Sequence, residues 1–394
     1  MAKSERNPLR ELVFPVFLPS LVYAVGENAL IPMIPASAER LGANLATASI
    51  IAGMIMVGTL LADIPASKLI ARIGERRGML YSAFAAAGGL AITALATNLW
   101  TMALGISLVG ASAAVFALAR HTYIAENVPY ENRGRSLSVL GGMFRAGGFL
   151  GPLLSGLLIT LGDLNYVYWV ALGLCATAGF LVMTTKKEIV NPEDSQNRLS
   201  TWHITKREWN KLSTLGVASA LLAIVRTARI IGLPLWALYL HINPGTAALI
   251  IGAAAGLDVA LFYTSGQIMD RWGRRAAAVP TMLLLGLTMF LIPLTHDAWG
   301  LLIVGLVMSL ANGLGSGIIM TIGADLAPAD ARGEFLAAFR LLIDGSTSLT
   351  APILSIATAT VGLGFGFVLV GAMSISGAWL MFKHIPIHIK HPQE

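Results

Sequence analysis

Besides Lys68, which lies near a helix end, nine charged residues lie inside apolar stretches of the 394-residue sequence, where a charge needs a partner or water. Four are acids and five are arginines: Glu27, Asp63, Asp258 and Asp344, with Arg120, Arg145, Arg226, Arg229 and Arg340. A charged side chain near the centre of a bilayer costs about 2.5–3.5 kcal/mol even on the mildest scale. These residues must therefore face water or one another. Acids in such places can carry protons, and arginines can bind acids.

The motifs of several enzyme and pump classes are missing. The sequence has no Gly-x-x-x-x-Gly-Lys-Ser/Thr phosphate loop, no His-Glu-x-x-His zinc motif and no Gly-x-Ser-x-Gly nucleophile elbow. Its single cysteine, Cys175, excludes a disulfide framework, a structural zinc site and an iron–sulfur cluster, and we expect it to fill the core. We therefore expect no enzymatic activity, no cofactor and no metal.

Twelve apolar stretches must position these charges. The chain is 56% hydrophobic and 12% charged, against roughly 25% charged residues in a soluble protein, which excludes a water-soluble globule. The stretches fall near residues 11–33, 47–70, 78–97, 100–122, 136–160, 166–184, 213–240, 247–269, 276–295, 299–323, 335–360 and 363–382. Each is long enough for a membrane helix, and no alternating barrel strands occur, so we predict an all-α membrane protein with 12 transmembrane helices. A cleaved signal peptide ending at Ala36-Ser37-Ala38 is less favoured, because the first stretch is long and contains Glu27.

The connections between the stretches differ strongly in positive charge. Twenty Lys and Arg residues fall in the two tails and in every second connection, and one, Arg40, falls on the other side. Because cytoplasmic loops carry the excess of Lys and Arg, this asymmetry predicts an even number of spans with both termini in the cytoplasm. It also explains the net charge of +6 without nucleic-acid binding.

A long polar connection at residues 185–212 divides the spans six and six. We therefore predict two domains, residues 1–184 and 213–394, joined by a cytoplasmic linker. Within this linker, Ile204–Leu212 is either a short interfacial helix, with Trp202 and Trp209 at the headgroups, or a solvated segment.

The two halves of the sequence repeat each other. The segment from Ile70 to Arg77 aligns with the segment from Met269 to Arg275 when Gly74 is matched to Gly273, a shift of 199 residues. The same shift carries Glu126 onto Asp325, and Arg133-Gly134 onto Arg332-Gly333. Parallel repeats of six helices are the arrangement of major facilitator transporters.

The motifs themselves resemble that superfamily. Gly266-x-x-x-Asp270-Arg271-x-Gly273-Arg274-Arg275 is similar to its complete 2–3 loop signature, here in the 8–9 connection. In the 2–3 connection the copy is degenerate, with Ser67, Ala71 and Glu75 at signature positions. Gly147-x-x-x-Gly151-Pro152-x-x-Ser155-Gly156 resembles the helix-5 signature of the drug–proton antiporters, with Ser155 replacing a Gly, whereas the helix-4 Arg of that group is missing, because Ile106 precedes Gly110. The resemblance covers the whole chain and implies two pseudo-symmetric six-helix bundles.

The resemblance also implies a central cavity beside helices 1, 4 and 7. Glu27 and Arg229 each lie five residues before a proline, at matching places in the repeats, and are expected to face each other across it as the proton-coupling pair. The expected cavity residues are Glu27, Asn28, Arg120, His121, Tyr123, Arg226, Arg229 and Asp344. For His121 by itself, a packing histidine is the favoured interpretation.

A cytoplasmic gate is expected at the loop signatures. By resemblance, Asp270, Arg274 and Arg275 meet the start of helix 5 and Asp325 at the end of helix 10. The remaining gate and motif residues are Arg72, Gly74, Arg76, Arg77, Glu126, Gly266, Arg271 and Gly273. The helix-5 motif, Gly147, Gly151, Pro152 and Gly156, is expected to make a bent, closely seated helix.

Four further charges are expected to form ion pairs between the halves. Counted from the cytoplasmic boundary, Asp63 lies at the depth of Arg340, and Asp258 lies within about one helical turn of Arg145. By resemblance helix 2 faces helix 11, and helix 5 faces helix 8, which makes Asp63–Arg340 and Asp258–Arg145 the expected pairs. Separate solvation of each charge in a wide cavity is the alternative.

These features predict a secondary transporter that works by alternating access. We expect proton-coupled efflux of amphipathic small molecules, as in multidrug exporters. A transporter or flippase for organic anions or anionic lipids is the alternative, because five arginines stand against four acids inside the spans. A membrane-embedded enzyme and a non-transporting receptor are the competing classes. The expected setting is a prokaryotic plasma membrane, with a small-molecule substrate, protons and lipid as partners and the chain as a monomer.

Overall fold

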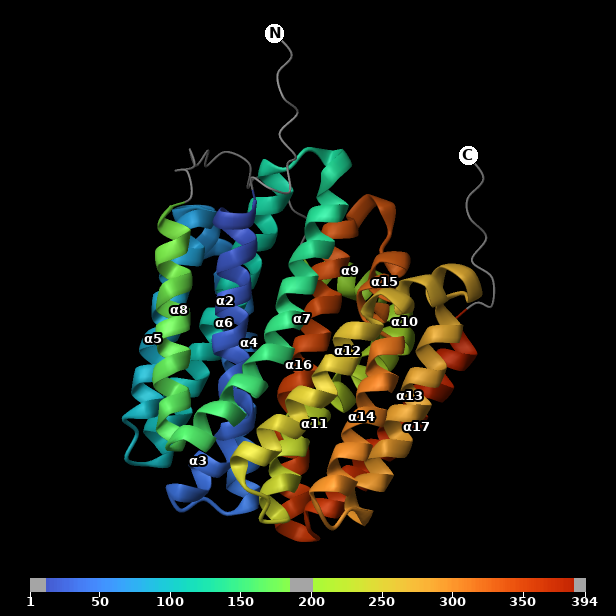
Figure 1. Ribbon diagram of the computed structural model, residues 1–394. Coiled ribbons are helices and arrows are strands. Elements are labelled where there is room, and N and C mark those ends of the chain that lie inside the picture. The colour runs from blue at the N-terminus through green and yellow to red at the C-terminus, as the bar shows by residue number, and fades with distance from the viewer. Residues whose placement is uncertain (1–11, 185–200, 386–394) are drawn as a thin grey trace. The chain divides into compact units, whose positions relative to one another are not determined.

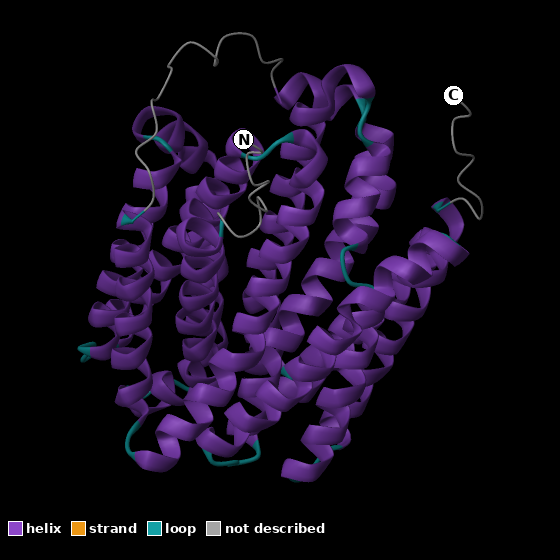
Figure 2. Cartoon of the chain, turned by 45° about the horizontal axis from the view of Figure 1, so that its top comes forward, coloured by secondary structure: helices purple, strands orange, loops and turns teal. Residues whose placement is uncertain are grey.

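The computed structural model describes residues 12–184 and 201–385. Within these two ranges the chain is helical, and no strand occurs (Figure 2). The two tails and most of the predicted linker, residues 185–200, lie outside the described residues. Inside a membrane, long apolar stretches with few turn residues form helices, because a helix satisfies the hydrogen-bonding groups of its own backbone.

The chain divides into two compact units. The first unit comprises residues 1–43 and 54–196, and the second comprises residues 44–53 and 197–394. Residues 44–53, which are Asn44 and the beginning of α4, thus group with the second unit. The predicted domain boundaries at residues 184 and 213 stay a prediction.

The α-helices before the linker are labelled in Figure 1. In chain order the helical segments of this part are η1 (Val13–Phe17), α2 (Leu18–Leu30), η2 (Ile31–Met33), α3 (Ile34–Arg40), α4 (Leu45–Ile73), α5 (Glu75–Ala94), α6 (Leu99–Asn127), α7 (Tyr130–Leu161) and α8 (Leu164–Met183). In the first unit, α5 packs against α6 and α8, and α2 packs against α7 and α8. This packing surrounds α2, which carries Glu27, with helices.

The helices after the linker form the rest of the second unit. They are α9 (Thr201–Arg207), α10 (Trp209–Lys211), η4 (Leu212–Gly216), α11 (Val217–Tyr239), α12 (Pro244–Trp272), α13 (Arg274–Leu291), η5 (Ile292–Leu294), α14 (Ala298–Leu314), α15 (Ile318–Leu326), η6 (Ala329–Ala331), α16 (Arg332–Thr360) and α17 (Leu363–His384). Here α12 packs against α14, α13 against α17, and α11 against both α16 and α17.

Eleven helical segments of the described ranges are long and apolar enough to cross a membrane. They correspond to eleven of the twelve predicted stretches. The twelfth is α5, a helix of 20 residues that is rich in Ala and Gly and begins with Glu75, Arg76 and Arg77. Although the hydropathy of α5 is modest, this helix packs against both α6 and α8. The all-helical fold with 12 long helical segments is confirmed.

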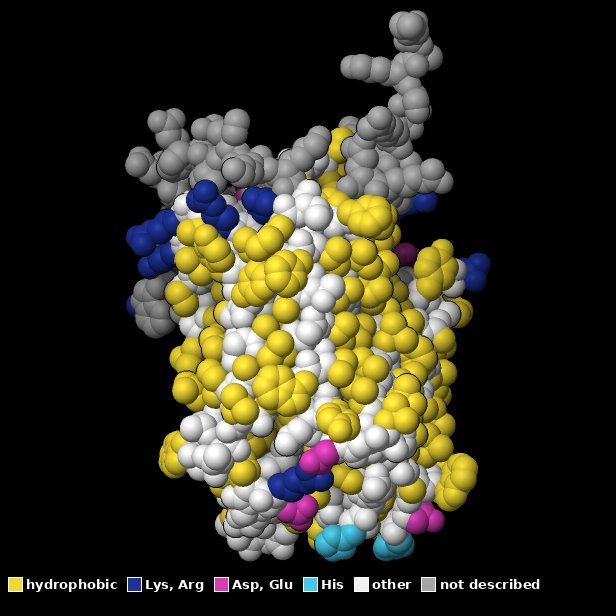
Figure 3. Space-filling model, turned by 60° about the vertical axis from the view of Figure 1, so that its left-hand side comes forward, with side chains coloured by type: hydrophobic (Ala, Val, Ile, Leu, Met, Phe, Trp, Pro, Cys, Tyr) yellow, Lys and Arg dark blue, Asp and Glu magenta, His cyan; other side chains and the backbone are white. Residues whose placement is uncertain are grey.

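Hydrophobic side chains cover the surface between the helix ends. On the face in Figure 3 they form the middle, and Lys and Arg side chains gather toward one end. Trp100, Met320 and Tyr263 are 87%, 79% and 76% exposed, which suits contact with lipid rather than water. Arg40 pairs with Asp163 at the start of α8 (2.5 Å), and this hydrogen bond holds the pKa of the Asp163 carboxyl below its ordinary value.

The sequence repeat is also a repeat of backbone geometry. Gly74 and Gly273, the matched residues of the loop signatures, have φ values of 83° and 84° and ψ values of 161° and 167°. Residues that have a side chain rarely adopt this backbone conformation, so glycine is required at both turns. Asn98 and Asp297, again 199 residues apart, cap α6 and α14 by accepting hydrogen bonds from backbone N–H groups.

The tenth span is broken, where the sequence predicts one helix over 299–323. α14 ends at Leu314 and α15 begins at Ile318, with Gly317 in the left-handed region (φ 81°). Three glycines within five residues, Gly313 to Gly317, have low helix propensity and explain the break. The carbonyls freed by the break accept side-chain hydrogen bonds, from Arg226 to Gly315 (2.8 Å) and from Ser265 to Ser316 (2.7 Å).

Candidate functional site

Glu27 and Arg120 form the charged centre of the first unit. Glu27 lies on α2 and Arg120 on α6, close enough for their charges to interact. Arg120 is 6% exposed, and its guanidinium lies 5.8 Å from the ring centroid of Phe116 and 5.5 Å from that of Phe144. Aromatic faces stabilise a cation without neutralising it. The arginine therefore keeps its charge available to a carboxylate.

Unused hydrogen-bonding atoms surround this centre. The Tyr23 ring stacks on Phe116 (4.2 Å between centroids), and Tyr23 is 2% exposed. Among the described residues, neither the Tyr23 hydroxyl nor Arg120 Nε has a hydrogen-bond partner. Buried polar atoms without partners are costly, so water or a polar ligand is expected to reach them.

The other expected cavity residues of the first unit differ in where they lie. Asn28 is half-buried, and its amide donates to the carbonyl of Ala24 (2.8 Å). Tyr123, one turn after Arg120, is buried. The His121 ring is exposed, with Nδ1 at 2.5 Å from the carbonyl oxygen of Ala117, so it points to a different face of α6 from Arg120.

The helix-5 motif seats α7 against α2 beside Glu27. A Cβ added at Gly151 would lie 2.7 Å from the backbone nitrogen of Ala29, and one added at Gly147 would collide with Ala24. Ser155, which replaces a glycine of the resembling signature, donates to the carbonyl of Ala29 (2.5 Å). Pro152 lies within α7, which continues as a helix around it. The motif therefore fixes the height and rotation of α2, and with them the place of Glu27.

A polar network joins three helices inside the second unit. Arg229 of α11 donates from Nη2 to Asp258 Oδ2 of α12 (3.3 Å) and from Nη1 to Ser309 Oγ of α14 (3.0 Å). Asn312 of α14 donates to the same oxygen of Asp258 (2.6 Å). Sequence reasoning missed Ser309 and Asn312. The available signal was two polar residues spaced three apart in an otherwise apolar span.

The structure pairs several expected residues within one unit. Arg340 Nε lies 3.2 Å from Asp344 Oδ2, four residues along α16. Arg226 of α11 donates to the broken end of α14, as described above. The expected pairs Glu27–Arg229, Asp63–Arg340 and Asp258–Arg145 each join the two units and stay predictions.

The two loop signatures differ in their contacts. In the complete copy, Arg274 lies 3.2 Å from Asp325 and 3.6 Å from Asp270, and the Arg275 guanidinium lies 3.5 Å from the ring centroid of Phe382. In the degenerate copy, Arg76 donates to the carbonyl of Met183 at the end of α8 (2.6 Å). The remaining signature residues are placed as follows: Arg72, Arg77, Glu126 and Arg271 are exposed, and Gly266 and Gly156 lie within α12 and α7.

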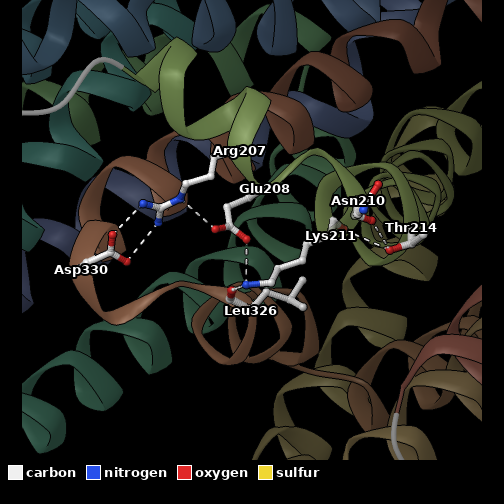
Figure 4. Close-up of polar contacts among 7 residues, drawn as sticks. All are labelled: Arg207, Glu208, Asn210, Lys211, Thr214, Leu326 and Asp330. Atoms are coloured by element: carbon white, nitrogen blue, oxygen red, sulfur yellow. Dashed lines mark hydrogen bonds and ion pairs between the residues drawn. The ribbon is translucent and has the colours of Figure 1, made fainter.

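A second charged cluster fixes α9 and α10 to the second unit (Figure 4). Arg207 makes two hydrogen bonds to the carboxylate of Asp330, at 2.6 and 3.0 Å. Glu208 pairs with Lys211 (2.9 Å), and Lys211 also donates to the carbonyl of Leu326 at the end of α15 (3.2 Å). These contacts hold the pKa of Asp330 and that of Glu208 below their ordinary values. This segment is helical, and because Ile204 is buried while Trp209 is 61% exposed, one side of it packs against the unit.

The model of the Major Facilitator Superfamily matches this chain over residues 16–352 and again over residues 215–393. Together the two matches cover nearly all of the described residues.

Curated relatives are similar at low identity. The multidrug resistance protein MdtG of Proteus mirabilis is 23% identical over 317 residues, which are 76% of this chain and 77% of that protein. The tetracycline resistance protein, class E, of Escherichia coli is 26% identical over 236 residues, 58% of each chain. An uncharacterized MFS-type transporter of Mycobacterium tuberculosis, Rv1877, is 27% identical over 150 residues, so that the match spans 38% of this chain and only 22% of that relative.

Solved structures share the fold over almost the whole chain. A POT family transporter in complex with 5-aminolevulinic acid has a TM-score of 0.78 at 12% identity, covering 96% of both chains. A D-xylose–proton symporter has a TM-score of 0.74 at 15% identity, covering 95% of this chain and 98% of the other. At these identities the likeness concerns the fold.

Proposed function

This chain belongs to the major facilitator superfamily, and we propose that it is a proton-coupled exporter of amphipathic small molecules that works by alternating access. It is an integral membrane transporter and not an enzyme. Its curated relatives include proteins named for multidrug and tetracycline resistance, which supports efflux. The proposed setting is a bacterial plasma membrane, with a monomeric chain and both termini in the cytoplasm.

The observation that carries the proton coupling is Glu27 beside Arg120 in the interior of the first unit. A carboxylic acid among apolar helices holds a proton readily, and a nearby guanidinium favours its release. A side chain under both influences can be loaded from one side of the membrane and discharged on the other. We propose Glu27 as the proton carrier, with Arg120 as its partner in the same unit and Arg229 as the partner expected from the repeat.

The test is transport in proteoliposomes with an imposed pH gradient. The panel comprises cationic dyes, anionic metabolites and labelled lipids. Glu27→Gln should abolish gradient-driven transport while ligand binding stays measurable, because glutamine keeps the shape but cannot carry a proton. Glu39→Gln, at an exposed position at the end of α3, is the matched control. Uphill transport that survives Glu27→Gln would end the proposal.

Organic anions are the second candidate substrate class. The specific observation is Arg226 and Arg229, one turn apart on α11, which both donate toward α14. Such a pair of guanidinium groups suits an acidic group on the substrate. Transport of anionic but not cationic members of the panel would favour this class.

A further inference from the structure

The network of Arg229, Asp258, Ser309 and Asn312 holds a second buried carboxylate, Asp258, which the proposed proton exchange at Glu27 does not use. It lies in the second unit, where one carboxylate from α12 meets one guanidinium from α11 and two neutral side chains from α14. The side chains of Arg229 and Asp258 are 14% and 12% exposed. An ion pair so placed inside a membrane span is costly to build and marks a functional position.

The network also contains two buried polar atoms that make no hydrogen bond to the described residues. Arg229 Nε is a buried donor, and Asn312 Oδ1 is a buried acceptor, and neither meets a partner among the described residues. Asn312 is 8% exposed. A rotated Asn312 amide would turn Oδ1 toward Asp258, where it can accept the hydrogen of a protonated carboxyl group. The spare donor on Arg229 suits an additional oxygen ligand.

The two members of the pair are not equivalent toward an entering charge. Arginine does not lose its proton in proteins, whereas aspartate can gain one. A cation that took Asp258 would leave the Arg229 charge buried and uncompensated. An anion that took Arg229 would leave Asp258, which becomes neutral by binding a proton. The site can therefore exchange partners without a net charge only for an anion.

We propose that Arg229 binds the acidic group of a transported amphipathic molecule, and that Asp258 takes up one proton from water as this group displaces it. The site then carries no net charge whether it is empty or occupied. The ligand class is an organic anion with an apolar body, such as a carboxylate or sulfonate. This rests on the proposed transport function, and the proton on Asp258 is distinct from the one exchanged at Glu27.

In this proposal the pH dependence of anion binding comes from Asp258. The charged groups on the helices packed against α12 are Arg226 and Arg229 of α11, and Arg274 and Arg275 at the start of α13, while α14 has no ionisable residue. On α12 itself, Asp270 and Arg271 lie about 18 Å along the helix from Asp258, and Tyr263 is exposed. Asp297 lies outside the spans, where it caps α14.

The experiment measures binding to the purified full chain in lipid nanodiscs. The probe is 2-naphthalenesulfonate, which stays ionised over roughly pH 5 to 8, so that any pH dependence belongs to the protein. Its apparent Kd should rise about tenfold for each pH unit over which Asp258 is ionised. Asp258→Asn should bind the probe with a Kd that hardly depends on pH, because asparagine mimics the protonated acid. Arg229→Gln should lower the affinity at least tenfold.

Two controls accompany these variants. The uncharged 2-naphthalenesulfonamide should bind weakly and without a pH slope. Asp297→Asn makes the same substitution at an exposed helix cap, where asparagine caps equally well, and should keep the full slope. If Arg229→Gln folds poorly, the double variant Arg229→Gln/Asp258→Asn removes both charges and should recover stability while still failing to prefer the sulfonate.

Three results would overturn the proposal. They are a wild-type Kd that does not change with pH, a slope that persists in Asp258→Asn, and equal binding of sulfonate and sulfonamide. The measurement uses no proton gradient. Loss of gradient-driven efflux in Glu27→Gln and loss of the slope in Asp258→Asn are therefore separate results, and either proposal can fail without the other.

Discussion

At the scale of single residues, Arg120 has the most demanding surroundings in the first unit. It is buried, its guanidinium lies within 5.8 Å of the centroids of two aromatic rings, and its charge interacts with that of Glu27. Rings cannot neutralise the guanidinium, so the carboxylate is the counter-charge that the unit itself supplies. The state of Glu27 and the position of Arg120 are therefore linked.

The first prediction concerns Arg120. Arg120→Gln should remove most gradient-driven transport, because Glu27 then lacks the cation that favours proton release. Arg120→Lys should retain part of it, since the charge remains although the planar contact with the rings is lost. The measurement is dye efflux from proteoliposomes under a pH gradient. Arg135→Gln, at an exposed position on α7, is the control, and equal rates in Arg120→Gln and wild type would refute the link.

Sequence reasoning found these charged residues but not all of their neighbours. Counting residues along a helix gives depth, so the nine charged positions inside the spans were recognisable. It does not give rotation, which decides whether α6 turns Arg120 or His121 toward α2. Ser309 and Asn312 carry no charge, so the energetic cost of placing them in a membrane is small. That cost therefore did not identify them as partners of Arg229 and Asp258.

At the scale of elements, turns decide where the long helices end. Gly273 combines φ 84° with ψ 167°, a region essentially restricted to glycine, whereas Gly317 has φ 81° and ψ −9°, in the left-handed region that asparagine tolerates. The break at Gly317 was not predicted, because an apolar run of that length satisfies the pattern of a single helix. Three glycines outweighed it.

The second prediction uses this difference between two turns. Gly273→Asn should lose about 1–3 kcal/mol of stability, and Gly317→Asn should lose much less, because only the second backbone conformation is open to asparagine. A side chain at Gly317 causes no steric clash, because an added Cβ would meet nothing within 4 Å. Thermal unfolding of the two variants in detergent measures it. Equal losses would contradict the conformational argument.

The third prediction concerns the cluster that fixes α9 and α10. Arg207 holds the pKa of Asp330 below its ordinary 3.8, and Lys211 holds that of Glu208 below 4.5. Since both folded values are lowered, the stabilisation is complete above the ordinary values and is lost only as the pH falls through the lower, folded ones. Docking of α9 and α10 should thus be indifferent to pH over roughly pH 5 to 8 but weakened by salt, because the charges are exposed.

Hydrogen exchange of the α9 and α10 amides measures this docking. Exchange should become a few-fold faster in high salt and in Asp330→Asn. The variant should also lose most of its salt dependence, because its strongest ion pair is gone. A strong change in protection between neutral and mildly acidic pH would show that other groups hold the segment.

At the scale of the whole molecule, the repeat was the most informative sequence signal. It identified Gly74 and Gly273 as equivalent turns and led to the superfamily, and the fold followed from both. The pairing of charges between the halves could not be predicted with the same security, because it depends on how two separate units meet. The sequence specifies each unit by its own apolar faces, caps and turns.

The fourth prediction addresses one of those pairs by a double-mutant cycle. If Asp63 and Arg340 interact, Asp63→Asn and Arg340→Gln should each lower expression or thermal stability. The double variant should recover part of the loss, because no single charge is left behind. Arg340 also contacts Asp344 at 3.2 Å, so Asp344→Asn combined with Arg340→Gln measures the competing interaction. Strictly additive losses for Asp63 and Arg340 would exclude the pair.

The caps and turns that recur 199 residues apart bear on how the chain is made. A helix cap acts locally, through residues within one turn of it, and so needs nothing that is synthesised later. By the time the ribosome reaches α9, every cap and glycine turn that bounds the first six spans has already been synthesised. Each span of that half can therefore enter the membrane with its ends already defined. The second half, which has caps and turns at the matching positions, can then be inserted in the same way.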